Sequence, residues 1–158
     1  MKKIHDDFLK PPQQQLNNLI KYYQAGQYVD AEKLSLSITQ EFPKHQFAWK
    51  VLAVLLKRNG RISESLIVSK KSVQLDPQDA EAHNNLGVLL QEQGKLYEAE
   101  KSHRKAIELK PDYAEAHNNL GNTLKQQDKL DGAEKCYKKV IKLKPDLSLI
   151  HISEPTRL

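Results

Sequence analysis

The chain contains very little cysteine, tryptophan and phenylalanine. Its 158 residues include one cysteine, one tryptophan and three phenylalanines. The single Cys136 excludes an intrachain disulfide and leaves no cluster of thiols for a metal site. Because aromatic side chains are scarce, aliphatic residues and alanines must build most of the core. This composition fits a protein that folds in a reducing compartment, and we expect no cofactor.

Long apolar runs are also missing. The start of the chain, Met1 to Pro12, has lysines but no apolar run of the length that a signal peptide needs. No stretch approaches the ~18 consecutive apolar residues of a membrane-spanning helix. We therefore expect a cytoplasmic protein with no membrane partner.

Positive charge is in excess, and much of it lies late in the chain. The net charge is +5 at pH 7. The late lysines are Lys135, Lys138, Lys139, Lys142 and Lys144. A basic helix face can bind phosphates, but a solvated helix face is the more common origin of such a run. Since no nucleic-acid-binding motif accompanies the lysines, we expect no nucleic-acid partner.

Four prolines recur at a fixed interval of 34 residues. They are Pro43, Pro77, Pro111 and Pro145. A period of this length indicates a stacked array of small helical repeats rather than one globular core. Alignment on the prolines predicts a lead segment at 1–11, repeats at 12–45, 46–79, 80–113 and 114–147, and a tail at 148–158.

The third repeat shows why each repeat should form two helices. Leu86, Gly87 and Leu90 lie on one stripe of a first helix. Gly94 follows, at a turn where a positive φ costs least in glycine. A second apolar stripe consists of Leu96, Ala99, Ala106, Ile107 and Leu109. Pro111 then ends the second helix, because proline cannot continue one.

The turn between the two helices differs in the fourth repeat. The first two repeats have Gly26 and Gly60 at this turn, whereas the fourth has Asp128. Aspartate tolerates the left-handed conformation better than most residues, though less well than glycine. Gly132 then lies inside the next helix, at a cost of up to ~1 kcal/mol. We therefore expect the fourth repeat to be locally the weakest.

The repeats resemble those of the tetratricopeptide-repeat family. The second repeat carries the family pattern as Trp49, Leu52, Ala53 and Leu56. The third carries it as His83, Leu86, Gly87, Leu90, Ala99, His103, Ala106 and Pro111. The first, most degenerate repeat keeps Tyr22, Gly26, Tyr28, Ala31 and Pro43. The resemblance implies an all-α fold, an α-solenoid of about four helix-turn-helix repeats that winds into a right-handed superhelix.

The resemblance also implies that the first helices line a concave inner surface. The sixth position of successive repeats holds Asn17, Val51, Asn85 and Asn119. This series resembles the asparagine ladder of O-linked N-acetylglucosamine transferase repeats, where amides hold a peptide backbone. An amide donates and accepts hydrogen bonds at once, which suits an extended peptide of any sequence. Val51 interrupts the ladder, and paired asparagines are also common consensus residues at these positions.

The expected function is a non-enzymatic scaffold that binds an extended peptide or a partner helix on the concave face. The candidate contacts are Lys50, Lys57, Asn85, Asn119, Asn122 and Lys125. The chaperone-tail clamp of the same family fits less well. Val54 stands where the clamp needs asparagine, and Glu115 replaces one of its cations.

Two other candidate sites have simpler interpretations. His83 and His117 share one position of adjacent repeats, where the family usually has a packing aromatic, and no carboxylate or thiol recurs with them. Cys136 has no evident histidine partner, which favours a buried structural cysteine. No phosphate-binding loop and no hydrolase or metalloprotease motif occurs.

The repeat pattern stops after Pro145. The segment 147–157, LSLIHISEPTR, resembles the in-frame translation of an adaptor used in sequencing libraries. We therefore expect a non-native or disordered tail at 148–158, and a natural protein that continues past about residue 146. In that case this chain is a fragment, and the alternative function is the recognition arm of a larger enzyme: a glycosyltransferase, sulfotransferase or oxygenase.

An uncapped last helix should also expose apolar side chains. We expect Val140, Ile141 and Leu143 to be partly exposed where a fifth repeat would cover them. Such a surface predicts self-association through the C-terminal repeat.

Overall fold

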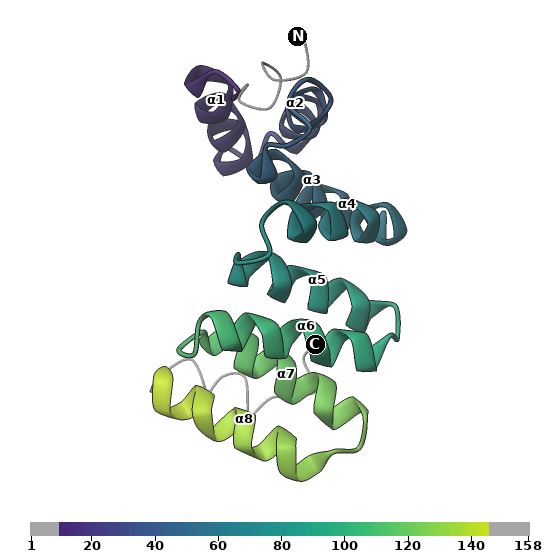
Figure 1. The fold of residues 1–158 in the computed structure, drawn as a ribbon, viewed down its shortest axis with the longest axis vertical. Helices are drawn as coiled ribbons and strands as arrows, with labels where there is room; N and C mark the ends of the chain where they lie inside the picture. The colour runs from purple at the N-terminus through teal and green to yellow at the C-terminus, as the bar shows by residue number, and fades with distance from the viewer. Residues whose placement is uncertain (1–9, 146–158) are drawn as a thin grey trace, which may run out of the picture. The chain divides into compact units, whose positions relative to one another are not determined.

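A computed structural model describes residues 10–145, and over this range every regular element is an α-helix (Figure 1). The helices are α1 Gln13–Gln24, α2 Tyr28–Glu41, α3 Gln46–Arg58, α4 Ile62–Leu75, α5 Ala80–Glu92, α6 Leu96–Leu109, α7 Ala114–Gln126 and α8 Leu130–Leu143. The predicted all-α fold of helix-turn-helix repeats is confirmed. The predicted tail at 148–158 lies outside the described residues. The exact repeat boundaries and the right-handed superhelix stay predictions.

The chain divides into two compact modules, Met1–Pro77 and Gln78–Leu158. We call them the N-terminal and the C-terminal module. In the N-terminal module, α2 packs against α1 and α3, and α3 packs against α4. In the C-terminal module, α6 packs against α5 and α7, α7 packs against α8, and α5 also contacts α7. None of the helices in residues 10–145 combines the length and the apolar character needed to cross a membrane.

Each helix pair is joined by a turn with one residue in the left-handed conformation. The φ angles are +74° at Gly26, +76° at Gly60, +74° at Gly94 and +60° at Asp128. The next residue donates its backbone N–H to the carbonyl five residues earlier, as in Lys95 to Leu90 at 2.9 Å. This is the Schellman arrangement, which satisfies a carbonyl at the helix end. The predictions for the glycine turns and for Asp128 are confirmed.

Alanine allows close packing between helices of the C-terminal module. Ala99 and Ala106 on α6 have no exposed surface. Leu89 and Leu90 on α5 are each 2% exposed. Because protein interiors are closely packed, the space around a fully buried methyl group cannot hold a larger side chain without a shift of the neighbours.

Ala99→Leu should therefore lower the free energy of unfolding by ~1–3 kcal/mol through overpacking. Lys101→Leu is the matched control, since it adds a leucine at an exposed position of the same helix. Urea unfolding of both variants measures the difference. Equal stability of the Ala99→Leu variant and the parent chain would contradict the packing described here.

The exposure of α8 differs in part from the prediction. Val140 is only 1% exposed, so the expectation that it is partly bare is wrong. Val140 lies on the same helical stripe as Ala133 and Cys136, which are also buried, and α8 packs against α7. Ile141 lies about a quarter turn away and is 46% exposed, as expected. Self-association through this end of the chain stays a prediction.

Candidate binding surfaces

The two first helices of the C-terminal module, α5 and α7, are joined by polar side chains. Asn119 Nδ2 on α7 donates a 3.2 Å hydrogen bond to Asn84 Oδ1 on α5. One turn further along α7, the Thr123 hydroxyl lies 3.2 Å from Gln91 Oε1. These contacts hold the amide-rich stretches of the two helices beside each other.

Asn84 connects this contact to a buried histidine. The Nδ1–H of His103 on α6 donates to Asn84 Oδ1 at 2.9 Å, so this oxygen accepts from both His103 and Asn119. Neither Asn84 nor His103 has any exposed surface. Burial lowers the pKa of His103 to about 4, so the imidazole is neutral at physiological pH. The Asn119 amide is thus oriented by a network that reaches from the surface into the core.

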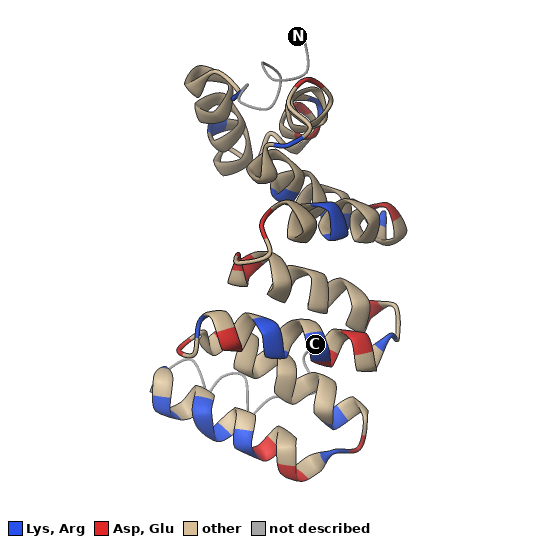
Figure 2. Ribbon diagram, viewed as in Figure 1, with Lys and Arg blue, Asp and Glu red and all other residues tan. Residues whose placement is uncertain are grey.

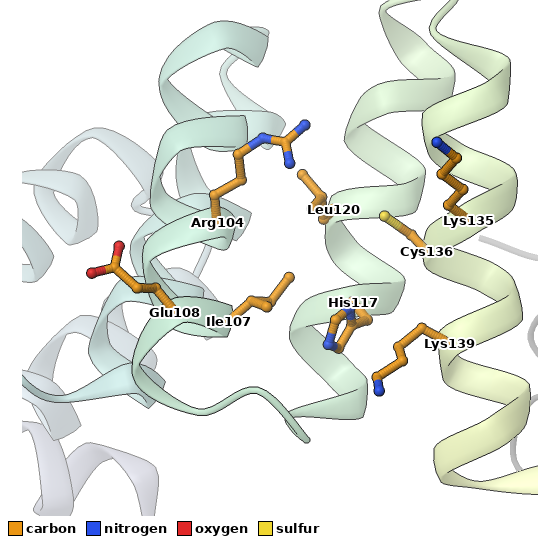
Figure 3. Close-up of a pocket in the computed structure, with 8 residues that line it drawn as sticks. All are labelled: Arg104, Ile107, Glu108, His117, Leu120, Lys135, Cys136 and Lys139. Carbon is orange, nitrogen blue, oxygen red and sulfur yellow. The ribbon is translucent and has the colours of Figure 1, made fainter.

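A second surface of the C-terminal module is a cleft formed by α6, α7 and α8 (Figure 3). Its volume is about 410 Å³. We call it the α6–α8 cleft; it is lined by Arg104, Ile107, Glu108, His117, Leu120, Lys135, Cys136 and Lys139. Three of these side chains are cations, and the aliphatic side chains come from α6 and α7.

His117 and Cys136 fit structural roles. His117 Nε2 lies 2.8 Å from the carbonyl oxygen of Pro111. Trp49, at the same position two repeats earlier, donates its indole N–H to the carbonyl of Pro43 at 2.9 Å. Cys136 is buried, and burial raises the pKa of its thiol, which keeps it protonated. Within residues 10–145, no three acidic, histidine or cysteine residues lie close enough together to hold a metal ion.

Comparison with protein families decides the classification. A family model described as tetratricopeptide repeat matches residues 78–146, and one described as TPR repeat matches residues 55–94. The chain belongs to the tetratricopeptide-repeat family. Neither description names a catalytic activity. A comparison with curated proteins finds no match.

Solved tetratricopeptide-repeat structures share the fold. A crystal structure of MamA is 26% identical, with a TM-score of 0.74 over 79% of this chain and 73% of that one. YrrB, described as a TPR protein with an unusual peptide-binding site, is 22% identical, with a TM-score of 0.75 over 84% and 69%. The Thermobaculum terrenum O-GlcNAc transferase (a K341M mutant) is 28% identical, with a TM-score of 0.67 over 71% of this chain and 22% of that one.

Four of the six predicted contact residues lie on the first helices of the C-terminal repeats. We call the surface of Asn85 on α5 and of Asn119, Asn122 and Lys125 on α7 the first-helix face. Figure 2 shows that α7 carries almost no charge between its ends, whereas α8 carries several lysines. The two remaining residues, Lys50 and Lys57, are half-buried on α3 in the N-terminal module. Their role in binding stays a prediction.

The structure adds intramolecular partners that repeat alignment does not reveal. Asn122 Oδ1 accepts a 2.6 Å hydrogen bond from the Tyr137 hydroxyl on α8. Asn84 directly precedes the candidate contact Asn85 but differs from it in being fully buried. A signal for this difference exists in the sequence, because His103 is a polar residue at a position that another repeat fills with Tyr137. A buried polar side chain requires a hydrogen-bond partner, and Asn84 supplies it.

Proposed function

We propose that the chain is a non-enzymatic scaffold that holds an extended peptide or a partner helix on the concave face formed by the first helices of its repeats. Tetratricopeptide-repeat proteins generally bind protein or peptide partners. The observation that carries the proposal is the oriented amide of Asn119 on the first-helix face, fixed by Asn84 and His103. We place the scaffold in the cytoplasm, because its single cysteine requires no oxidising compartment.

The amides of α7 are arranged to pair with a peptide backbone. Asn119 uses its Nδ2 for Asn84 and presents its oxygen as an acceptor. Asn122 uses its oxygen for Tyr137 and presents its amide hydrogens as donors. The two residues are three positions apart and therefore share one face of α7. One acceptor and one donor side by side match the N–H and C=O of an extended backbone, whatever its side chains.

The remaining candidate contacts are one amide and three lysines. Asn85 on α5 adds another amide, and Lys125 in the last turn of α7 adds an exposed positive charge. Lys50 and Lys57 are the candidate contacts on α3 of the N-terminal module. We propose that these residues contact the peptide, with the lysines favouring an acidic side chain or a C-terminal carboxylate.

Replacing both Asn85 and Asn119 with alanine should weaken peptide capture about tenfold, since each lost hydrogen bond contributes roughly 0.5–1.5 kcal/mol. The loss should be similar across an array of immobilised peptides of varied sequence, because the bonds go to the backbone. Gln40→Ala is the control, since it removes an exposed amide from α2. Circular dichroism should show unchanged helicity, and undiminished peptide capture by the double variant would refute the proposal.

A second candidate function is the recognition arm of a larger enzyme. It is favoured by the similarity to the O-GlcNAc transferase, of which this chain matches less than a quarter. A glycosyltransferase, sulfotransferase or oxygenase domain would then lie in another part of the same gene product. The sequence of the full reading frame distinguishes the two candidates, since only the second requires a catalytic domain in it.

A further inference from the structure

We propose that the α6–α8 cleft is a second binding site, and that its ligand is an acidic peptide segment carrying an aliphatic side chain. This surface is distinct from the first-helix face, because it is formed mainly by the second helices, α6 and α8, with α7 as its floor. The cleft would recognise the carboxylates of its ligand, whereas the first-helix face would recognise the backbone amides of a peptide.

The positive charge of the cleft is not neutralised by its own acidic residues. Lys135 and Lys139 on α8 form no ion pair within residues 10–145. Figure 3 shows the Glu108 carboxylate turned away from α7 and α8. Glu108 is instead paired with Lys105 at 3.1 Å. Arg104 does have a carboxylate partner, Glu100, at 2.9 Å, but Glu100 is shared with a further lysine, Lys129.

The N-terminal module contains the corresponding cleft with a different lining. That cleft, of about 270 Å³, lies over α3 between α2 and α4. Four of its residues are 68 positions, two repeat lengths, before residues of the α6–α8 cleft. The pairs are Leu36 with Arg104, Leu52 with Leu120, Ile67 with Lys135, and Val68 with Cys136. The floor leucine is thus the same, while two rim positions change from aliphatic to cationic.

This comparison separates the demands of folding from those of binding. The same groove is built with Leu36 and Ile67 in one module, so the repeat architecture does not require cations at these two positions. In the N-terminal cleft the one cation, Arg61, is also bound by two carboxylates, Glu32 and Glu64. The unneutralised cations therefore give the α6–α8 cleft a specific preference for a negatively charged ligand.

The floor of the cleft favours a peptide over a nucleic acid. Ile107, Leu120 and Cys136 present apolar atoms between the cations (Figure 3). An aliphatic side chain of a peptide can pack there while neighbouring carboxylates reach Arg104, Lys135 or Lys139. Among the described residues, no phenylalanine, tyrosine or tryptophan lines the cleft, and its one ring, that of His117, is only 9% exposed, so a broad platform for base stacking is missing there.

The test uses a fluorescein-labelled peptide of about a dozen residues that alternates glutamates with leucines, and its counterpart with glutamine for glutamate. Fluorescence anisotropy with the full chain should show that the acidic peptide binds about tenfold more tightly, and that salt weakens it. The double variant Arg104→Leu with Lys135→Ile, which installs the residues of the N-terminal cleft, should reduce binding about tenfold. The matched control, Lys101→Leu with Lys142→Ile, removes two lysines of α6 and α8 that do not line the cleft and should change the affinity less than about twofold.

Three outcomes would overturn the proposal. They are equal weakening by the cleft and control variants, equal affinity for the glutamate and glutamine peptides, and tighter binding of a single-stranded DNA of similar length. If the double variant does not fold, Lys135→Gln and Lys139→Gln remove charge at the rim with less change in packing. The Asn85→Ala and Asn119→Ala variant should keep the tenfold preference for the glutamate peptide over the glutamine peptide, which separates this site from the first-helix face.

Discussion

Gly87→Ala should lower the free energy of unfolding by about 2–3 kcal/mol, even though alanine is intrinsically the better helix former. A Cβ atom added at Gly87 would lie 2.5 Å from Cε1 and 2.7 Å from Nδ1 of the His103 ring. The ring has no exposed surface and is bonded to Asn84, so it cannot move aside without breaking that bond. The overpacking cost should therefore exceed the gain in helix propensity of ~1 kcal/mol.

Two further variants identify the cause of this loss. Gly132→Ala is the control, because its Cβ would lie 3.2 Å from only the flexible Cδ1 atom of Leu124. This substitution should be neutral or stabilising by up to ~1 kcal/mol. In the background of His103→Ala, Gly87→Ala should cost little, because the ring that it would meet is gone. Chemical unfolding of the single and double variants measures the coupling, and additive effects would contradict the ring-contact explanation.

The contact between glycine and an aromatic ring recurs in the next repeat. A Cβ at Gly121 would lie 2.7 Å from Cε1 of Tyr137. The glycines are 34 residues apart and so are the two rings, so the close approach belongs to the repeat itself. Gly87 therefore allows the close approach of a ring on α6, that of His103, rather than of the helix backbone.

The proline period was enough to predict the helix-turn-helix fold, because each boundary depends on local chemistry. Proline ends a helix through its missing N–H, and glycine adopts a positive φ at little cost. Asp128 was predictable at the same turn because an aspartate side chain tolerates that conformation. These are properties of single residues and their neighbours in the chain, so they are visible without tertiary contacts.

The candidate sites were less predictable, because they depend on contacts between repeats. Asn84 and Asn85 are adjacent in sequence and chemically identical, yet only Asn84 is fully buried. The difference arises from the rotation of α5 against α6 and α7. Val140 was likewise expected to be exposed, since a 34-residue pattern does not say which side chains of α8 face α7. The α6–α8 cleft was not predictable from the sequence because its cations come from two repeats. Within α8 alone, Lys135 and Lys139 have the spacing of an ordinary solvent-exposed helix face.

Acid should destabilise the C-terminal module in a pH range set by His103. Burial lowers the pKa of this imidazole to about 4 in the folded chain, whereas an unfolded histidine has a pKa of 6.5. Between these values the unfolded chain binds the additional proton, so protonation favours unfolding. The contribution of the neutral imidazole to the free energy of unfolding is fully present above pH 6.5 and is lost as the pH falls toward 4. The loss should reach roughly 3 kcal/mol at the lower end of the range, from the size of the pKa difference.

The titration of His103 can be separated from that of the carboxylates. Burial alone would raise the pKa of Glu100, but hydrogen bonds from Lys129 and Arg104 outweigh it and leave the pKa below its ordinary value of 4.5. The ionised Glu100 therefore loses its contribution to the free energy of unfolding only as the pH falls below 4.5. Between pH 6.5 and 4.5 the slope should come from His103 together with His45, whose pKa is also lowered by burial and by the nearby Lys10, and a variant of His103 alone isolates the first contribution.

Urea unfolding at a series of pH values tests this assignment with His103→Tyr, which installs the residue found one repeat later at Tyr137. The variant should show a flatter dependence of stability on pH between 6.5 and 4.5, whatever its absolute stability, because tyrosine does not titrate in that range. Retention of the parent slope by the variant would show that another group is responsible.

Since His103 donates to Asn84, and Asn84 accepts from Asn119, the protonation of His103 also links the core to the first-helix face. In the folded chain this imidazole takes up its proton only near pH 4, so peptide capture by the parent chain should stay constant between pH 6.5 and 4.5 and weaken as the pH approaches 4, and less so in the variant.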